Sequence, residues 1–142
     1  MSCILHIETS TDLCSIAVSD DSQVIYREEN RDGHSSEHLG SMVDAAISFT
    51  DSHAIPFDAV AVSSGPGSYT GLRIGVSIAK GICFGRDLKL IAVPTLELLC
   101  VPVLIRDEVK ATGTGGETTA SLPDDALLCP MLDARRMEVY TR

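Results

Sequence analysis

The sequence predicts an α/β domain with the element order βββαβαβα around a mixed sheet. Two observations support this fold class. The first thirty residues hold three short apolar or alternating runs joined by polar turns, which is typical of an antiparallel meander. After residue 35, helical periodicity alternates with short apolar runs, which is typical of parallel strands joined by helices. With 142 residues, 44% of them apolar, the chain is long enough for one domain with an aliphatic core.

The N-terminal part is expected to form the meander and then a helix. The three strands cover residues 3–7, 14–18 and 23–29, and the third is polar enough for a sheet edge. Apolar residues then recur at spacings of three and four, at Leu39, Met42, Val43, Ala46 and Ile47. This periodicity predicts an amphipathic helix from residue 35 or 36 to about residue 52.

A fourth strand, residues 59–63, leads into a glycine-rich loop and a second helix that starts near Thr70. The spacing of Gly65, Gly67 and Gly71 fits neither a P-loop nor the dinucleotide fingerprint. Three interpretations stay open at this point. The glycines permit a tight turn and close packing, or the loop binds phosphate at the helix N-terminus, or it faces a partner or substrate.

The second helix is apolar nearly all round, with Arg73 and Lys80 as its charged residues before position 86. Its small residues Gly71, Gly75 and Ala79 are spaced four apart and share one face. Such a helix needs cover on more than one side. It is therefore either central in its own domain or covered on its outer face by another protein.

The remaining chain divides into three predicted parts. The N-terminal lobe covers residues 1–108 and ends with a strand at 89–93 and a helix that Thr95 can cap. Residues 109–124 lack apolar periodicity and are expected to form a flexible linker. Residues 125–142 are expected to form a hairpin, with a strand at 126–132, then Asp133, and a turn at 134–136.

The two ends of the chain share one pattern. Each has a strand, an acidic residue (Glu8 or Asp133), a short turn and a second strand. This repeat predicts two similar lobes, the second cut off after its first hairpin. A βββαβαβα lobe of this kind is the half-unit of actin-like and ribonuclease H-like folds.

Composition excludes several classes of function. The formal net charge of −9 argues against an independent nucleic-acid binder. The N-terminus lacks the pattern of a signal peptide, and no membrane span is expected. The five cysteines form no Cys-x-x-Cys pair, so neither a disulfide framework nor a zinc site is expected. A reducing, cytoplasmic setting is expected instead.

Few residues are candidates for chemistry. Glu8 and Asp133 could face each other across a cleft, beside the hydroxyl-bearing turn Thr9, Ser10 and Thr11, as in an actin-like ATPase or kinase with its own nucleotide site. That turn has no glycine, which weakens the hypothesis, and capping of strand ends is the simpler explanation. The segment HSSEH, with His34 and His38, lacks the spacing of a zinc site. No catalytic or metal-binding residue is predicted.

Four segments carry a family resemblance: ILHIETSTDLCSIAV, HSSEHL, SSGPGSYTGLRIGVSIAKGI and MLDARRMEVY. In this order they resemble the TsaB (YeaZ) family, bacterial tRNA threonylcarbamoyladenosine biosynthesis proteins of the actin-like superfamily. The resemblance implies that the chain is a non-catalytic scaffold and not an enzyme. The catalytic paralogue TsaD is expected to require this scaffold for its activity. TsaD carries a metal-binding His-x-x-x-His where this chain, at residues 93–100, has no histidine. Protease activity, implied by the old "glycoprotease" label, is not expected.

The resemblance also implies partners. TsaD is expected to bind through the first two helices, and the chain alone is expected to form a homodimer through the same surface. TsaE, an ATPase, is a further implied partner, and tRNA contact is expected to be indirect. No cofactor is expected, and a nucleotide only at the partner interface. The predicted interface residues are Leu39, Met42, Val43, Ala46, Gly71, Ile74, Gly75, Ile78, Ala79 and Ile82.

Overall fold

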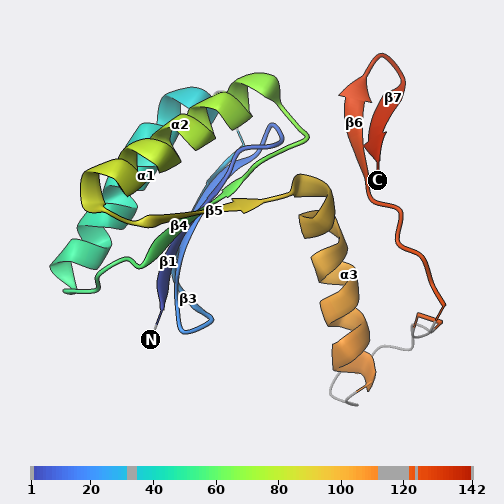
Figure 1. Ribbon diagram of the computed structural model, residues 1–142, viewed down its shortest axis with the longest axis horizontal. Helices are drawn as coiled ribbons and strands as arrows, with labels where there is room; N and C mark the ends of the chain where they lie inside the picture. The colour runs from blue at the N-terminus through green and yellow to red at the C-terminus, as the bar shows by residue number, and fades with distance from the viewer. Residues whose placement is uncertain (1, 32–34, 112–121, 124, 142) are drawn as a thin grey trace.

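A computed structural model describes residues 2–31, 35–111, 122–123 and 125–141 (Figure 1). The predicted order βββαβαβα is confirmed, and a two-stranded hairpin follows it. The elements are β1 (Cys3–Glu8), β2 (Cys14–Asp20), β3 (Gln23–Asn30), α1 (Ser35–Ser52), β4 (Ala59–Ser63), α2 (Tyr69–Arg86), β5 (Lys89–Val93), α3 (Thr95–Ala111), β6 (Met131–Arg135) and β7 (Glu138–Thr141).

The first five strands form one mixed sheet, as predicted, in the order β3-β2-β1-β4-β5. The pairs β1–β2 and β2–β3 are antiparallel, whereas β1–β4 and β4–β5 are parallel. The carboxyl ends of parallel strands meet at one edge of a sheet. This edge therefore gathers the turn after β1, the glycine loop after β4 and the start of α3.

Helices α1 and α2 lie on the same side of the sheet (Figure 1). Strands β1 and β2 alternate buried and half-buried residues, so one of their faces builds the core beneath these helices. The fully buried aliphatic side chains Leu5, Ile16, Val18, Leu39 and Val60 come from β1, β2, α1 and β4. The core of the lobe is therefore closed by its own first two helices.

Helix α3 begins at Thr95 and leads away from the sheet (Figure 1). The predicted cap is wrong, because the buried Thr95 hydroxyl has no hydrogen-bond partner among the described residues. The helix extends through Ala111, three residues into the predicted linker. The rest of that linker, residues 112–121 and 124, lies outside the described residues, so the domain boundaries stay predictions. No helix in the described segments is long and apolar enough to cross a membrane.

The C-terminal hairpin forms with different bounds from those predicted. Its first strand starts at Met131 instead of residue 126, and the turn lies at residues 136–137 instead of 134–136. A strand extends only where a neighbour supplies hydrogen bonds. Met131 pairs with Thr141, so residues 126–130 have no partner strand in the described part of the chain. Asp133 lies inside β6, opposite Val139, and does not end the strand as Glu8 ends β1.

Candidate functional site

The glycine loop before α2 is held against the turn after β1. The Ser68 amide donates to the Ser10 carbonyl at 2.6 Å, and the Ser68 hydroxyl accepts from the Gly71 amide at 3.3 Å as the N-cap of α2. Gly65 and Gly67 have φ of +101° and +158°, a region that favours glycine. A Cβ at Gly67 would also lie under 3.0 Å from the Ser10 carbonyl oxygen. The loop thus needs glycine for its turn and for close packing.

The small-residue stripe of α2 faces inward, not toward a partner. A Cβ added at Gly71 would lie under 3.0 Å from the Thr9 carbonyl oxygen, and one at Gly75 under 3.0 Å from the Thr9 hydroxyl. Ala79 is fully buried in the core of the lobe. The prediction that Gly71, Gly75 and Ala79 contact a partner is therefore corrected, because the protein's own first turn occupies their face.

The four predicted interface residues of α1 are also interior. Leu39, Met42, Val43 and Ala46 are at most 5% exposed and belong to the core cluster of the lobe. The periodicity correctly identified one apolar face of α1, but that face covers the sheet. Of the predicted interface set, only three isoleucines on α2 remain partly exposed: Ile74, Ile78 and Ile82.

The outward side of α2, opposite the small-residue stripe, carries an open groove of about 390 Å³. Phe84, further along this helix, is 94% exposed, although it is a large apolar side chain. The outward face of α2 thus combines an open groove with a large exposed apolar side chain further along the helix. The groove is lined by Tyr69, Thr70, Arg73, Ile74, Ser77 and Ile78.

The helix is oriented by contacts at both of its ends. At its C-terminal end, the Arg86 guanidinium donates to both carboxylate oxygens of Asp51 on α1, at 3.0 and 2.8 Å. The Asp51 carboxylate raises the pKa of Arg86, and the guanidinium lowers the pKa of Asp51. With Ser68 and the glycine contacts at the other end, these bonds fix which face of α2 points outward.

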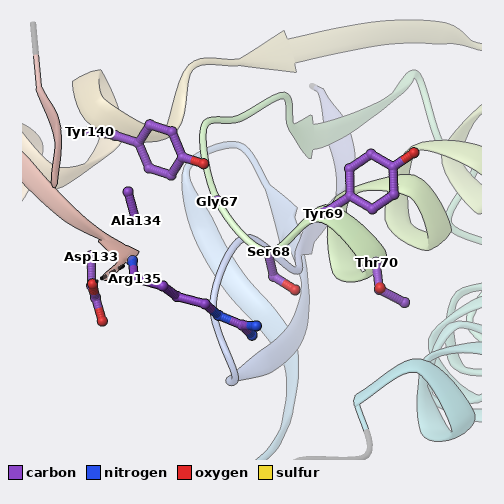
Figure 2. A pocket seen from close by; sticks show the side chains of 8 residues that line it. All are labelled: Gly67, Ser68, Tyr69, Thr70, Asp133, Ala134, Arg135 and Tyr140. Carbon is purple, nitrogen blue, oxygen red and sulfur yellow. Dashed lines mark hydrogen bonds between the residues drawn. The ribbon is translucent and has the colours of Figure 1, made fainter. Parts of the chain in front are cut away.

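A second cavity, of about 390 Å³, lies where the hairpin meets the N-terminal end of α2 (Figure 2). The Arg135 side chain extends from the hairpin toward Ser68, and Tyr140 points toward Gly67 (Figure 2). The cavity lining is Gly67, Ser68, Tyr69, Thr70, Asp133, Ala134, Arg135 and Tyr140.

Only some of the residues predicted to form a nucleotide cleft lie close together in the structure. A smaller adjoining pocket, of about 170 Å³, is lined by Ser10 and Thr11 from the turn and by Asp133 from the hairpin. Glu8 does not line it, and its carboxylate accepts from the Ser10 amide at 2.6 Å within its own turn. Thr9 is buried, with its hydroxyl against Gly75. The pair Glu8 and Asp133 therefore does not form the paired-carboxylate arrangement that the ATPase hypothesis needs.

The histidines and acidic residues of the described segments do not gather into a metal site. His34 lies outside the described residues, and His38 is exposed on α1. Among the side chains that the structure describes, no three from His, Cys, Asp or Glu come close enough to hold a metal ion. The half-buried His6 shares a hydrogen bond of 2.8 Å with the Ser19 hydroxyl, and burial lowers the pKa of its ring.

Sequence reasoning missed several residues of these two surfaces. Tyr69, Ser77 and Phe84 lie away from the small-residue stripe on α2, so its helical period could have placed them on the outward face. Arg135 and Tyr140 could not be placed next to this helix, because their position depends on how the hairpin folds against the lobe.

Comparisons with known proteins agree with the fold. Residues 28–142 match the family model of TsaD, described as tRNA N6-adenosine threonylcarbamoyltransferase. The TsaB protein of Escherichia coli is 36% identical over 93 residues, which are 66% of this chain and 40% of that protein. The TsaB protein of Bacillus subtilis is 33% identical over 140 residues, 97% of this chain and 53% of that protein.

A solved structure shows the same architecture. YeaZ from Pseudomonas aeruginosa superposes with a TM-score of 0.67 at 25% sequence identity, over 99% of this chain and 59% of that chain. The chain thus spans about half the length of the relatives it matches. These matches confirm the actin-like lobe and the predicted family. The chain belongs to the TsaD family, and its relatives there include TsaB (YeaZ) proteins and a Wolbachia tRNA N6-adenosine threonylcarbamoyltransferase, 31% identical over 126 residues, 78% of this chain and 38% of that protein.

Proposed function

We propose that this chain acts in threonylcarbamoyladenosine modification of tRNA, in the cytoplasm, as a non-catalytic subunit that binds a TsaD-type protein. Family membership supports the pathway, since its relatives are named either as threonylcarbamoyladenosine biosynthesis proteins or as a tRNA N6-adenosine threonylcarbamoyltransferase. The observation that carries the binding role is the outward face of α2, which carries a groove in its first half and, further along, Phe84, which is 94% exposed. In this proposal the partner covers that face, and the catalytic residues are the partner's.

The proposal replaces the predicted interface with a narrower one. The inward residues of α1 and α2 contribute by holding α2 in place, whereas Ser77, Ile78 and Phe84 contact the partner. Complete burial of a phenylalanine side chain contributes about 1.5–3 kcal/mol, equivalent to about 10- to 150-fold in Kd. Phe84 alone can therefore make a measurable difference to the complex.

The pull-down of a TsaD-type protein from the same organism by this chain tests the proposal. Phe84→Asp and Ser77→Arg should each weaken binding at least tenfold, since both residues are exposed and neither change disturbs the core. Leu127→Asp is the matched control, because Leu127 is 95% exposed but lies in the segment before β6 and not on α2. Binding that survives both α2 variants, or no binding by the unchanged chain, would overturn the proposal.

The same surface is proposed to pair with a second copy when no partner is present. An interface of this kind is isologous, so Phe84 would lie in both halves of it. Light scattering across protein concentrations should show a dimer for the unchanged chain and a monomer for Phe84→Asp. A TsaE-type ATPase, and any nucleotide, are proposed to join only the assembled complex. The absence of glycine from the turn 9–12 and the inward hydrogen bond of Glu8 support this assignment.

A further inference from the structure

The cavity between the hairpin and the N-terminal end of α2 combines one cation with two aromatic rings. Arg135 extends into it toward Ser68 (Figure 2). Asp133 also lines the cavity, and its Oδ1 accepts from the backbone amide of Arg135 at 2.8 Å. Within the described residues, the Arg135 guanidinium forms no ion pair. A cation with a hydroxyl group near it, here that of Ser68, is suited to a phosphate group.

The two tyrosines of the cavity are exposed and point in different directions. Tyr140 points toward Gly67, whereas Tyr69 extends along the far side of the loop (Figure 2). Tyr69 is 74% exposed, and the Arg73 guanidinium lies 5.2 Å from its ring centroid and donates to its hydroxyl at 3.2 Å. An exposed ring held in place by an arginine is suited to stacking against a nucleic-acid base.

We propose that this cavity binds a short single-stranded stretch of RNA, with a phosphate at Arg135 and bases against Tyr69 and Tyr140. A strand offers phosphates and bases in alternation, so it can use two separate rings at once, whereas a free nucleotide has one base. The inference rests on the proposed function, because a tRNA-modification complex brings RNA to this chain. It also changes the expectation that contact with tRNA is wholly indirect.

The net charge of −9 limits what this cavity can do by itself. Affinity for RNA comes mostly from phosphate contacts, and here one cavity arginine faces an acidic protein. The site is therefore expected to orient a strand that partner subunits also hold. Its contribution is local, so it can be measured by changing single residues.

Fluorescence anisotropy with a labelled single-stranded RNA of about ten nucleotides, a length that one small domain can cover, tests the proposal on the whole chain. At low salt Arg135→Gln should weaken binding about fivefold and reduce the salt slope by about 0.7, which corresponds to the loss of one phosphate contact. Tyr69→Leu should weaken binding about tenfold, since a base loses its stacking surface.

Arg136→Gln is the matched control, because Arg136 is the neighbouring exposed arginine and does not line the cavity. It should change binding less than twofold. Equal effects of the two arginine variants would overturn the proposal, since they would show attraction by charge alone. Complete competition by AMP would also overturn it, by showing a free-nucleotide site. A lack of RNA binding at about 100 μM protein would overturn the proposal as well, because this concentration corresponds to the weakest Kd that is usual for sequence-independent binding.

This experiment separates the inference from the proposed function. Tyr69 and Thr70 line both the groove and the cavity, so the separation depends on Arg135, which lines the cavity but not the groove. The partner test changes Phe84 and Ser77, and its readout is a protein complex. RNA binding that depends on Arg135 but without capture of a TsaD-type protein would support the cavity and contradict the proposed partner. Capture of the partner without RNA binding would support the partner and contradict the cavity.

Discussion

Replacing Gly71 by alanine should destabilise the lobe, whereas the same change at Gly81 should stabilise it. Both residues lie in α2. A Cβ at Gly71 would lie under 3.0 Å from the Thr9 carbonyl oxygen, a backbone atom that cannot move without shifting β1. A Cβ at Gly81 would meet nothing within 4 Å. The helix therefore offers two glycines with opposite environments.

The magnitudes follow from these contacts. Overpacking costs about 1–3 kcal/mol, and a rigid backbone contact places Gly71→Ala near the upper limit. Gly81→Ala removes backbone freedom from the unfolded chain and should add up to about 1 kcal/mol to the free energy of unfolding. Urea unfolding followed by circular dichroism should show midpoints shifted in opposite directions, with unchanged slopes.

Gly75 provides the decisive comparison. The atom that a Cβ at Gly75 would meet first is the Thr9 hydroxyl, which belongs to a side chain. Thr9→Ala should therefore restore most of the stability lost in Gly75→Ala, but none of that lost in Gly71→Ala. The Thr9 hydroxyl has no partner among the described residues, so its removal should cost little by itself. If Gly71→Ala proves as stable as Gly81→Ala, or Thr9→Ala rescues both variants equally, the assigned packing is wrong.

Three further predictions concern titration and thiol access. Burial lowers the pKa of His6 below its ordinary value of 6.5, so the folded state binds fewer protons than the unfolded state and stability falls as pH drops below 6.5. His6→Asn should flatten that part of a stability–pH curve. An unchanged curve would contradict the assignment. Arg86 lowers the pKa of Asp51 below 3.8, so the ion pair should stabilise the fold at pH 7 and lose this effect as the carboxylate protonates below pH 3.8. Arg86→Gln should therefore be less stable than the unchanged chain at pH 7, and this difference should disappear below pH 3.8. A difference that does not depend on pH would show a non-ionic cause. Burial also raises the pKa values of Cys3, Cys14 and Cys83, so a thiol reagent should reach these three only on unfolding. It should first modify the exposed Cys129 and then Cys100. Rapid reaction of all five cysteines would contradict the burial of the three in the core.

The order of the elements in the lobe could be predicted from the sequence because each element is bounded by local signals. Pro94 stops β5, the glycine loop separates β4 from α2, and the polar turn at residues 9–12 separates β1 from β2. These signals act over a few residues, so no knowledge of the tertiary structure is needed. The hairpin was placed less well, since the start of β6 depends on where β7 offers a partner for Met131.

The interface residues could not be predicted by the same reasoning. Periodicity shows that α1 and α2 each have an apolar face, but it does not show what covers that face. For α1 the cover is its own sheet, and for the small-residue stripe of α2 it is Thr9. For the proposed partner face, the informative residue is Phe84, which is apolar and lies away from the stripe. A large apolar residue on the side opposite an inward stripe is a stronger signal for a partner than the stripe itself.

The proposed function gives the two faces of α2 separate roles, and this separation makes it testable in a second way. The inward face carries Gly71 and Gly75 and sets stability, whereas the outward face carries Ser77 and Phe84 and contributes little to it. An inward variant should therefore weaken partner binding only in proportion to the fraction of protein that it unfolds. An outward variant should weaken binding with no change in the urea midpoint. If Gly75→Ala lost binding while still fully folded, and Thr9→Ala did not restore it, the stripe itself would have to contact the partner, and the assignment of the two faces would be reversed.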